Sequence, residues 1–224
     1  HMKPYIAQFF KFLEKKEDKR VPLKAKLLYP NRFDKITSED LIVKRDLDLD
    51  GTDITSLPDN LRVEGSLILT NTPIKSLPDN LTVKRVLLLT GTKIKSIPSN
   101  LKVEGVLNLT GTKITSLPDN FTVGVSLSLD NTDITSLPDN LRVDEGSLYL
   151  SGTKITSLPD NFTVGEDLSL SDTDITSLPN NLKVGGALYL INTPLAEKYT
   201  REEIYSMIKE KGGYIKYRER AIYI

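Results

Sequence analysis

Alternating aspartates form the most chemistry-like pattern in the chain. Asp46, Asp48 and Asp50 precede Gly51, as in the acidic half of a twelve-residue calcium loop. Such a loop needs a bidentate Glu at its twelfth position, but Leu57 stands there. Alternate residues of a strand also lie on one face of it and cannot surround an ion. The sequence therefore predicts no metal site in this segment.

Carboxylates could also serve as a general acid and base. A glycosidase places two of them about 5–10 Å apart and raises the pKa of one by burial. Asp46 and Asp48, or acids on neighbouring repeats, could meet that spacing. No pattern indicates a deep or desolvated site, so a glycan-processing enzyme is the least favoured functional hypothesis.

Other catalytic groups are scarce. Cys is absent, and the one His is His1, which we interpret with Met2 as a scar from a purification tag. These absences exclude a Cys nucleophile, a Ser–His pair, a Cys/His zinc site and a disulfide framework. The sequence has no glycine-rich phosphate loop either. We therefore predict no enzyme activity and no cofactor.

Charge and hydropathy exclude two further classes of partner. Thirty basic and thirty acidic residues cancel, so no basic excess indicates nucleic-acid binding. No apolar run approaches the length of a membrane span. The missing cysteines fit a reducing compartment. The sequence predicts a cytoplasmic protein without membrane contact, a monomer rather than an oligomer.

Internal repeats dominate the chain. The period is 20 residues, with one unit of 21. A Ser-Leu/Ile-Pro tripeptide recurs with its Pro at positions 58, 78, 98, 118, 138, 159 and 179. Eight Leu-x-Leu pairs keep the same period, and this alternation predicts a short strand in each unit. The pairs are Leu47/Leu49, Leu67/Leu69, Leu87/Leu89, Leu107/Leu109, Leu127/Leu129, Leu148/Leu150, Leu168/Leu170 and Leu188/Leu190.

Fixed positions after each strand have separate physical roles. Gly, Asn or Asp comes two residues after the second Leu and predicts a turn with positive φ. The next residue is always Thr, which we expect to bond backbone groups of a neighbouring turn. An Ile follows and should point inward. After the Pro, an Asn column should be inward and hydrogen-bonded, and Leu/Phe and Val close the coil. Twenty residues leave room only for an extended or 3₁₀ back and moderate curvature.

This pattern resembles the leucine-rich repeats, specifically the short bacterial type with Leu-Pro in each unit. The match covers residues 41–196, about 70% of the chain. Thr replaces the Asn that most such repeats carry after the strand, and similar Thr variants occur in bacterial and bacteriophage proteins. The resemblance implies an α/β repeat solenoid with a short parallel β-sheet on its concave face and a mostly non-helical convex side. Some relatives carry a Cys-dependent ubiquitin-ligase domain, for which this chain has neither the Cys nor the length.

The ends of the chain should cap the solenoid, because a repeat stack exposes an apolar face at each end. Ile6, Phe9, Phe10 and Leu13 have helical spacing. Thr200 and Glu203 form a capping box before a second helix. We divide the chain into the scar at 1–2, an N-terminal helical cap at 3–40, eight repeats at 41–196 and a C-terminal helix–strand cap at 197–224. Either cap could instead contact a partner.

Residues that flank the strand leucines face the concave surface in a leucine-rich repeat. Most of them are small and polar here, but an apolar patch interrupts them, an acidic cluster precedes it and tyrosines follow it. We predict a partner-binding site that comprises Asp48, Ile68, Val86, Leu88, Val106, Asn108, Tyr149 and Tyr189. The alternative is a featureless face, or one covered by a terminal segment of the chain.

The leading functional hypothesis is a non-enzymatic module that binds a protein partner of unknown identity through this face. The resemblance fits a bacterial or phage effector, or an inhibitor of host factors in the host cytoplasm. A self-assembling structural protein is the second hypothesis.

Overall fold

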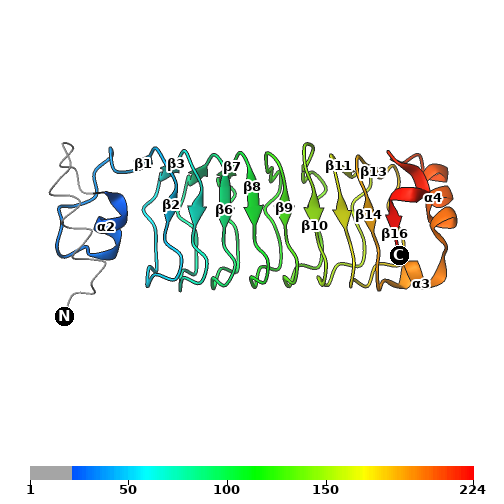
Figure 1. Cartoon of the computed structure of the whole chain (residues 1–224), viewed down its shortest axis with the longest axis horizontal. Helices are drawn as coiled ribbons and strands as arrows, with labels where there is room; N and C mark the ends of the chain where they lie inside the picture. Colours follow the sequence, from blue (N-terminus) through cyan, green and yellow to red (C-terminus); the bar gives the residue numbers. More distant parts are fainter. Residues whose placement is uncertain (1–21) are drawn as a thin grey trace.

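The computed structural model describes residues 22–224. They form a parallel β-solenoid whose turns stack nearly straight in the view of Figure 1. Its long central part contains no helix, so the back of each turn is extended as predicted. The predicted N-terminal helix at Ile6–Leu13 lies outside the described residues. None of the helices within 22–224 has the length and apolarity needed to cross a bilayer.

One side of the coil is a sheet of nine parallel strands. Each of the eight Leu-x-Leu pairs contributes one strand, and consecutive pairs delimit seven complete turns. A ninth strand comes from the end of the chain. In stacking order they are β2 (Leu47–Asp48), β4 (Leu67–Ile68), β6 (Val86–Leu88), β8 (Val106–Asn108), β9 (Leu127–Ser128), β10 (Leu148–Tyr149), β12 (Leu168–Ser169), β14 (Leu188–Tyr189) and β16 (Ile222–Tyr223).

A second row of strands lies just before the first in each turn, separated from it by a tight bend. The sequence predicted only that Leu/Phe and Val close the coil there. One group is β1 (Ile42–Val43), β3 (Arg62–Val63), β5 (Thr82–Val83) and β7 (Lys102–Val103). Isolated parallel bridges continue the row. The other group is β11 (Thr163–Val164), β13 (Lys183–Val184) and β15 (Tyr214–Ile215).

The predicted turn after each Leu-x-Leu strand is confirmed in every unit. All eight residues at this position have φ between 55 and 74°, the left-handed region that Gly, Asn and Asp tolerate. They are Gly51, Asn71, Gly91, Gly111, Asn131, Gly152, Asp172 and Asn192. The strand therefore ends at the same point in each turn, and the stack stays in register.

The Thr side chains form different hydrogen bonds from those predicted. Each hydroxyl donates to the carbonyl of the Leu three residues earlier in its own turn, at 2.6–2.7 Å, and none of these bonds reaches a neighbouring turn. The cause is distance: neighbouring turns lie about 4.8 Å apart, whereas the left-handed residue folds the chain back beside its own carbonyl. Seven of the eight Thr side chains are buried, and Thr52 is half-buried.

The Asn column also departs from the expected inward position. Five of its seven members are exposed on the return segment, and Asn100 and Asn181 are half-buried. Some still form a ladder between turns: Asn80 donates to Asn60 and Asn181 to Asn161, each at 3.0 Å, and Asn140 donates to Asn120. The core needs no polar column there, because the strand leucines and the Ile column, from Ile54 to Ile175, fill the interior.

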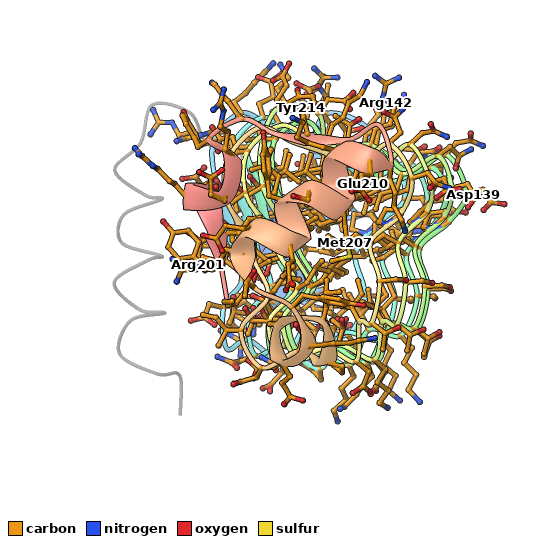
Figure 2. The ribbon with its side chains drawn as sticks, turned by 90° about the vertical axis from the view of Figure 1, so that its right-hand side faces the viewer. Asp139, Arg142, Arg201, Met207, Glu210 and Tyr214 are labelled. Atoms are coloured by element: carbon orange, nitrogen blue, oxygen red, sulfur yellow. The ribbon has the colours of Figure 1, made fainter. Side chains whose placement is uncertain are left out.

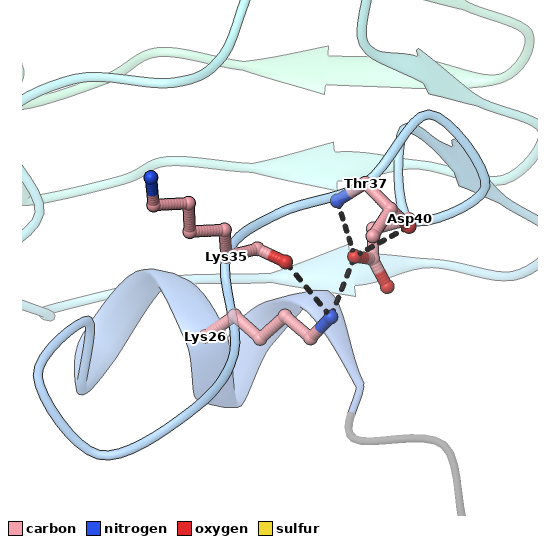
Figure 3. Close-up of polar contacts among 4 residues, drawn as sticks. All are labelled: Lys26, Lys35, Thr37 and Asp40. Carbon is pink, nitrogen blue, oxygen red and sulfur yellow. Dashed lines mark hydrogen bonds and ion pairs between the residues drawn. The ribbon is translucent and has the colours of Figure 1, made fainter.

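Helices lie at both ends of the described stack. At the N-terminal end, α2 (Leu23–Leu28) buries Leu23 and Ala25. Figure 3 shows Lys26 Nζ donating to Asp40 Oδ2 at 2.7 Å, and the Thr37 amide donating to the same oxygen at 2.7 Å. Burial alone would raise the pKa of Asp40, but these donors hold it below its ordinary value.

At the C-terminal end, α3 (Pro194–Lys198) and α4 (Arg201–Glu210) follow the last repeat. Figure 2 looks onto this end and shows α4 lying across the stack. The capping box of Thr200 and Glu203 is present, and Ile204 and Ile208 are buried in the common core. The 3₁₀ helix η1 (Arg218–Ala221) then leads into β16.

Candidate binding face of the nine-stranded sheet

The outward side of the nine-stranded sheet, called the sheet face below, consists of three columns of side chains. The central column alternates with the buried strand leucines, and the other two flank it. The strand register matches the one predicted from sequence, since each central residue pairs with its counterpart one unit away. From the N-terminal end, the central column is Asp48, Ile68, Leu88, Asn108, Ser128, Tyr149, Ser169, Tyr189 and Tyr223.

Four apolar side chains lie together near the N-terminal end of this face. Ile68 pairs with Leu88 and Val86 pairs with Val106, so the four occupy three adjacent strands. All four are half-buried, whereas the leucines between them on the same strands are fully buried. Figure 1 looks onto these strands and shows no described helix or loop crossing them. This group, called the apolar patch below, is therefore in contact with solvent in the described structure.

The aspartates before the patch are exposed, and two of them accept hydrogen bonds from backbone amides. Asp46 Oδ1 accepts from the Ser66 amide at 2.7 Å, and Asp48 Oδ1 accepts from the Asp50 amide at 3.0 Å. Within residues 22–224, no three acidic or other metal-ligating side chains form a group that could hold a metal ion. Asp46 and Asp48 thus stabilise the first turns, and together with Asp50 they add negative charge to the face.

The middle of the sheet face is a network of small polar groups. Asn108 Oδ1 accepts from the Thr110 amide at 3.0 Å, and the Thr110 and Ser128 hydroxyls lie 2.7 Å apart. The Ser151 and Ser169 hydroxyls are also 2.7 Å apart. Each hydroxyl pair joins two adjacent turns diagonally, so this part of the face is held rigid by side chains as well as by the sheet.

Tyrosines occupy the C-terminal third of the central column. Tyr149 is 36% exposed and Tyr223 is 42% exposed, whereas Ser169 between the tyrosine rows is only 8% exposed. The Tyr189 and Tyr223 rings stack with centroids 4.8 Å apart and planes 12° apart. Desolvation raises the pKa of Tyr189, and Asp167, Tyr223 and Tyr149 add to the shift. The phenol groups therefore stand close together on one side of the sheet.

The sequence-predicted site residues all lie on this face, but they do not form one cluster. Ile68, Val86, Leu88 and Val106 are contiguous, and Asp48 and Asn108 adjoin them. The row of Ser128 separates Asn108 from Tyr149, and the row of Ser169 separates Tyr149 from Tyr189. Sequence reasoning missed Tyr223, although Ala221-Ile222-Tyr223-Ile224 repeats the pattern of Ala187-Leu188-Tyr189-Leu190. That internal match was the signal for a ninth row.

Acid–base catalysis with the partly buried Asp130 would need a second carboxylate close to it. Partial burial raises the pKa of Asp130, opposed by a hydrogen bond from the Ser151 amide. On this face, the carboxylate nearest to Asp130 in the strand register is Asp167. It lies two turns away and four residues earlier along the strand direction. With a rise of about 3.3 Å per residue and a strand spacing of about 4.8 Å, the two backbones are about 16 Å apart. That separation exceeds the range in which two carboxylates share one glycosidic bond.

No protein-family model matches the chain, and no curated protein matches it at a significant level.

Proposed function

We propose that this protein is a non-enzymatic binding module that recognises a protein partner through the sheet face. The observation that carries the proposal is the apolar patch of Ile68, Val86, Leu88 and Val106 on three adjacent strands. A contiguous apolar group on an otherwise polar face favours an interaction site, since burying it against a partner removes apolar area from water. The rigid backbone of a β-stack keeps these side chains in place, which lowers the entropic cost of binding.

The leucine-rich-repeat type is part of this proposal. It is supported by eight Leu-x-Leu strands at a period of 20 or 21 residues, each followed by a left-handed residue. Helices α2 and α4 would then act as caps, because their apolar residues join the core of the stack. A bacterial or phage origin and an effector or inhibitor role rest on the resemblance alone, and a cytoplasmic location rests on the absence of Cys as well.

Affinity capture from the native host, or from the infected host if the gene is viral, tests the proposal. Leu88→Asp places a charge at the centre of the apolar patch and should abolish capture of the partner, because binding would bury that charge unpaired. Ile42→Asp is the matched control. Ile42 is 47% exposed on β1 in the second row of strands, away from the sheet face.

Both variants should unfold at the same denaturant concentration as the unmodified protein, since neither replaced side chain is part of the buried core. A partner set unchanged by Leu88→Asp would contradict the proposal. If light scattering instead showed concentration-dependent oligomers that Leu88→Asp dissolves, the sheet face would serve self-assembly.

A further inference from the structure

Charge is unevenly distributed between the sheet face and the rest of the chain. Across the eight repeats, the three columns of the face contain 24 positions, and none of them is Lys or Arg. At the average frequency of the chain, about three would be expected. Five of the positions are acidic: Asp46, Asp48, Asp50, Asp130 and Asp167. The face is therefore negative although the whole chain has no net charge.

Basic side chains lie elsewhere, and acids neutralise some of them. Glu64, beside the second row of strands, is within 4 Å of Lys44, Arg62 and Lys84. Asp133, after its left-handed turn residue, pairs with Lys154 at 3.0 Å and Lys113 at 3.8 Å. Neither Asp130 nor Asp167 has an ion pair with any basic residue of the described range 22–224.

These two aspartates flank the tyrosines. We call Tyr149, Tyr189 and Tyr223 the tyrosine shelf. Asp167 lies in the column on one side of the shelf, close enough to Tyr189 to raise the pKa of its phenol further, after desolvation. Asp130 lies in the column on the other side. The shelf thus combines exposed aromatic rings with carboxylates at both margins.

Each of the two carboxylates uses one oxygen to hold the next turn. Asp130 Oδ1 accepts from the Ser151 amide, and Asp167 Oδ1 accepts from the Ala187 amide, each at 2.7 Å. These bonds fix the carboxyl groups at the surface of the sheet. The second oxygen of each group has no hydrogen-bond donor among the described residues.

We propose that the partner presents a cationic segment, with Arg or Lys side chains, to the tyrosine shelf. This inference rests on the proposed function and names the chemistry of its partner. A guanidinium or ammonium group is attracted to the face of a Tyr ring and pairs with a carboxylate beside it. The absence of Lys and Arg from the face removes competing internal pairs, and the five carboxylates repel acidic partners and nucleic acid.

Two synthetic peptides of alternating residues probe this inference: one of Arg and Gly, the other of Glu and Gly. Their affinity for the full chain is measured by titration calorimetry at low and at physiological salt. The Arg peptide should bind, more weakly at the higher salt concentration, and the Glu peptide should not bind. The double variant Asp130→Asn/Asp167→Asn should weaken binding of the Arg peptide by about three- to tenfold.

Asn retains an acceptor oxygen for the Ser151 and Ala187 amides, so this variant removes charge while it keeps the structural bonds. Tyr149→Leu keeps apolar area without a π face and should weaken binding by about two- to fivefold, whereas Tyr149→Phe should bind as the unmodified chain does. Asp139→Asn is the matched control, because Asp139 is exposed on the far side of the coil from the C-terminal strand (Figure 2).

The inference is overturned if the Arg peptide fails to bind at low salt, or if Asp139→Asn weakens binding as much as the double variant does. It is also overturned if Tyr149→Leu binds as tightly as Tyr149→Phe, since the rings would then contribute nothing. Its failure is separable from that of the proposed function. Partner capture that Leu88→Asp abolishes but the Asp130/Asp167 variant leaves unchanged would retain the binding module and reject the cationic partner.

Discussion

Two glycines within one turn should differ in which substitutions they tolerate and in how much stability is lost, because they are required for different reasons. Gly111 has a φ of +72°, and a Cβ there would meet nothing within 4 Å. Gly105 lies at the bend between the two rows of strands, and a Cβ there would be 1.9 Å from the carbonyl oxygen of Arg85 in the preceding turn. The first site is restricted by backbone conformation and the second by space.

The structure gives a magnitude for each change. Gly111→Ala forces an L-residue into the left-handed region and should lower the free energy of unfolding by about 1–2 kcal/mol. Gly111→Asn should cost less than about 0.5 kcal/mol, because Asn71 and Asn131 adopt the same conformation at this position. Gly105→Ala must move one turn by more than 1 Å. The Val106 amide bonds the same carbonyl at 2.9 Å, so we expect a loss of about 2–4 kcal/mol.

Urea titration followed by circular dichroism measures these free energies. Val125→Ala is the control for the bend, because Val125 occupies the position of Gly105 in the next turn and is 38% exposed; it should cost less than about 0.5 kcal/mol. The reasoning is refuted if Gly105→Ala is no more destabilising than Gly111→Ala, or if Gly111→Asn is as destabilising as Gly111→Ala.

Three further substitutions test contacts of the turns and of the two ends by the same titration. Thr112→Val removes the 2.7 Å bond to the Leu109 carbonyl without leaving a cavity and should lower the free energy of unfolding by about 0.5–1.5 kcal/mol; an unchanged value would mean that the Thr column is held by shape alone. Thr200→Ala removes the capping box and should lower the free energy of unfolding by about 1 kcal/mol. Thr200→Ser should retain most of that stability, because its hydroxyl can accept the same hydrogen bond. The pKa of Asp40 is lowered in the folded state, so its stabilising effect is present above its ordinary pKa and is lost as pH falls through the folded-state value. From about pH 5 to pH 2, the unmodified chain should therefore lose more stability than Asp40→Asn does, and equal losses would contradict the role of Lys26.

Most of the repeated core and its turns could be predicted from sequence, because each turn repeats the same backbone and burial requirements. Leu-x-Leu alternation predicts a strand, and a residue tolerant of positive φ predicts its end; the eight turn residues satisfy that requirement. The inward Ile column followed from the same period. The outward residues of the sheet could be assigned in advance because a strand has only two faces. The strands, the turns and the inward columns are predictable because short-range geometry sets them and recurs in every unit.

The failures concern distances between turns, which no single unit contains. Thr hydroxyls bond within their own turn, because the left-handed residue brings a carbonyl nearer than the next turn can. The bend between the two rows was missed, although Gly65, Gly105, Gly146 and Gly186 recur at every second unit. The nearest atom of the preceding turn would lie 1.9–2.4 Å from a Cβ at any of them. Larger residues, including Arg85 and Val125, occupy the units between, so the true period at the bend is two units.

Residues fixed by folding are distinct from the outward residues of the sheet, so the outward residues can report on binding. Buried leucines, left-handed turn residues and close-packed glycines fix most positions of a turn, so their identities report on folding. The outward columns of the sheet meet none of these requirements: Asp48, Ile68 and Tyr149 occupy equivalent places in the central column without changing the strand register. Backbone hydrogen bonds give four of the five aspartates, Asp46, Asp48, Asp130 and Asp167, a role in folding, but they do not explain the absence of lysine and arginine from this face. The cationic partner proposed above would account for that absence and for the second carboxylate oxygens of Asp130 and Asp167, which have no donor among the described residues.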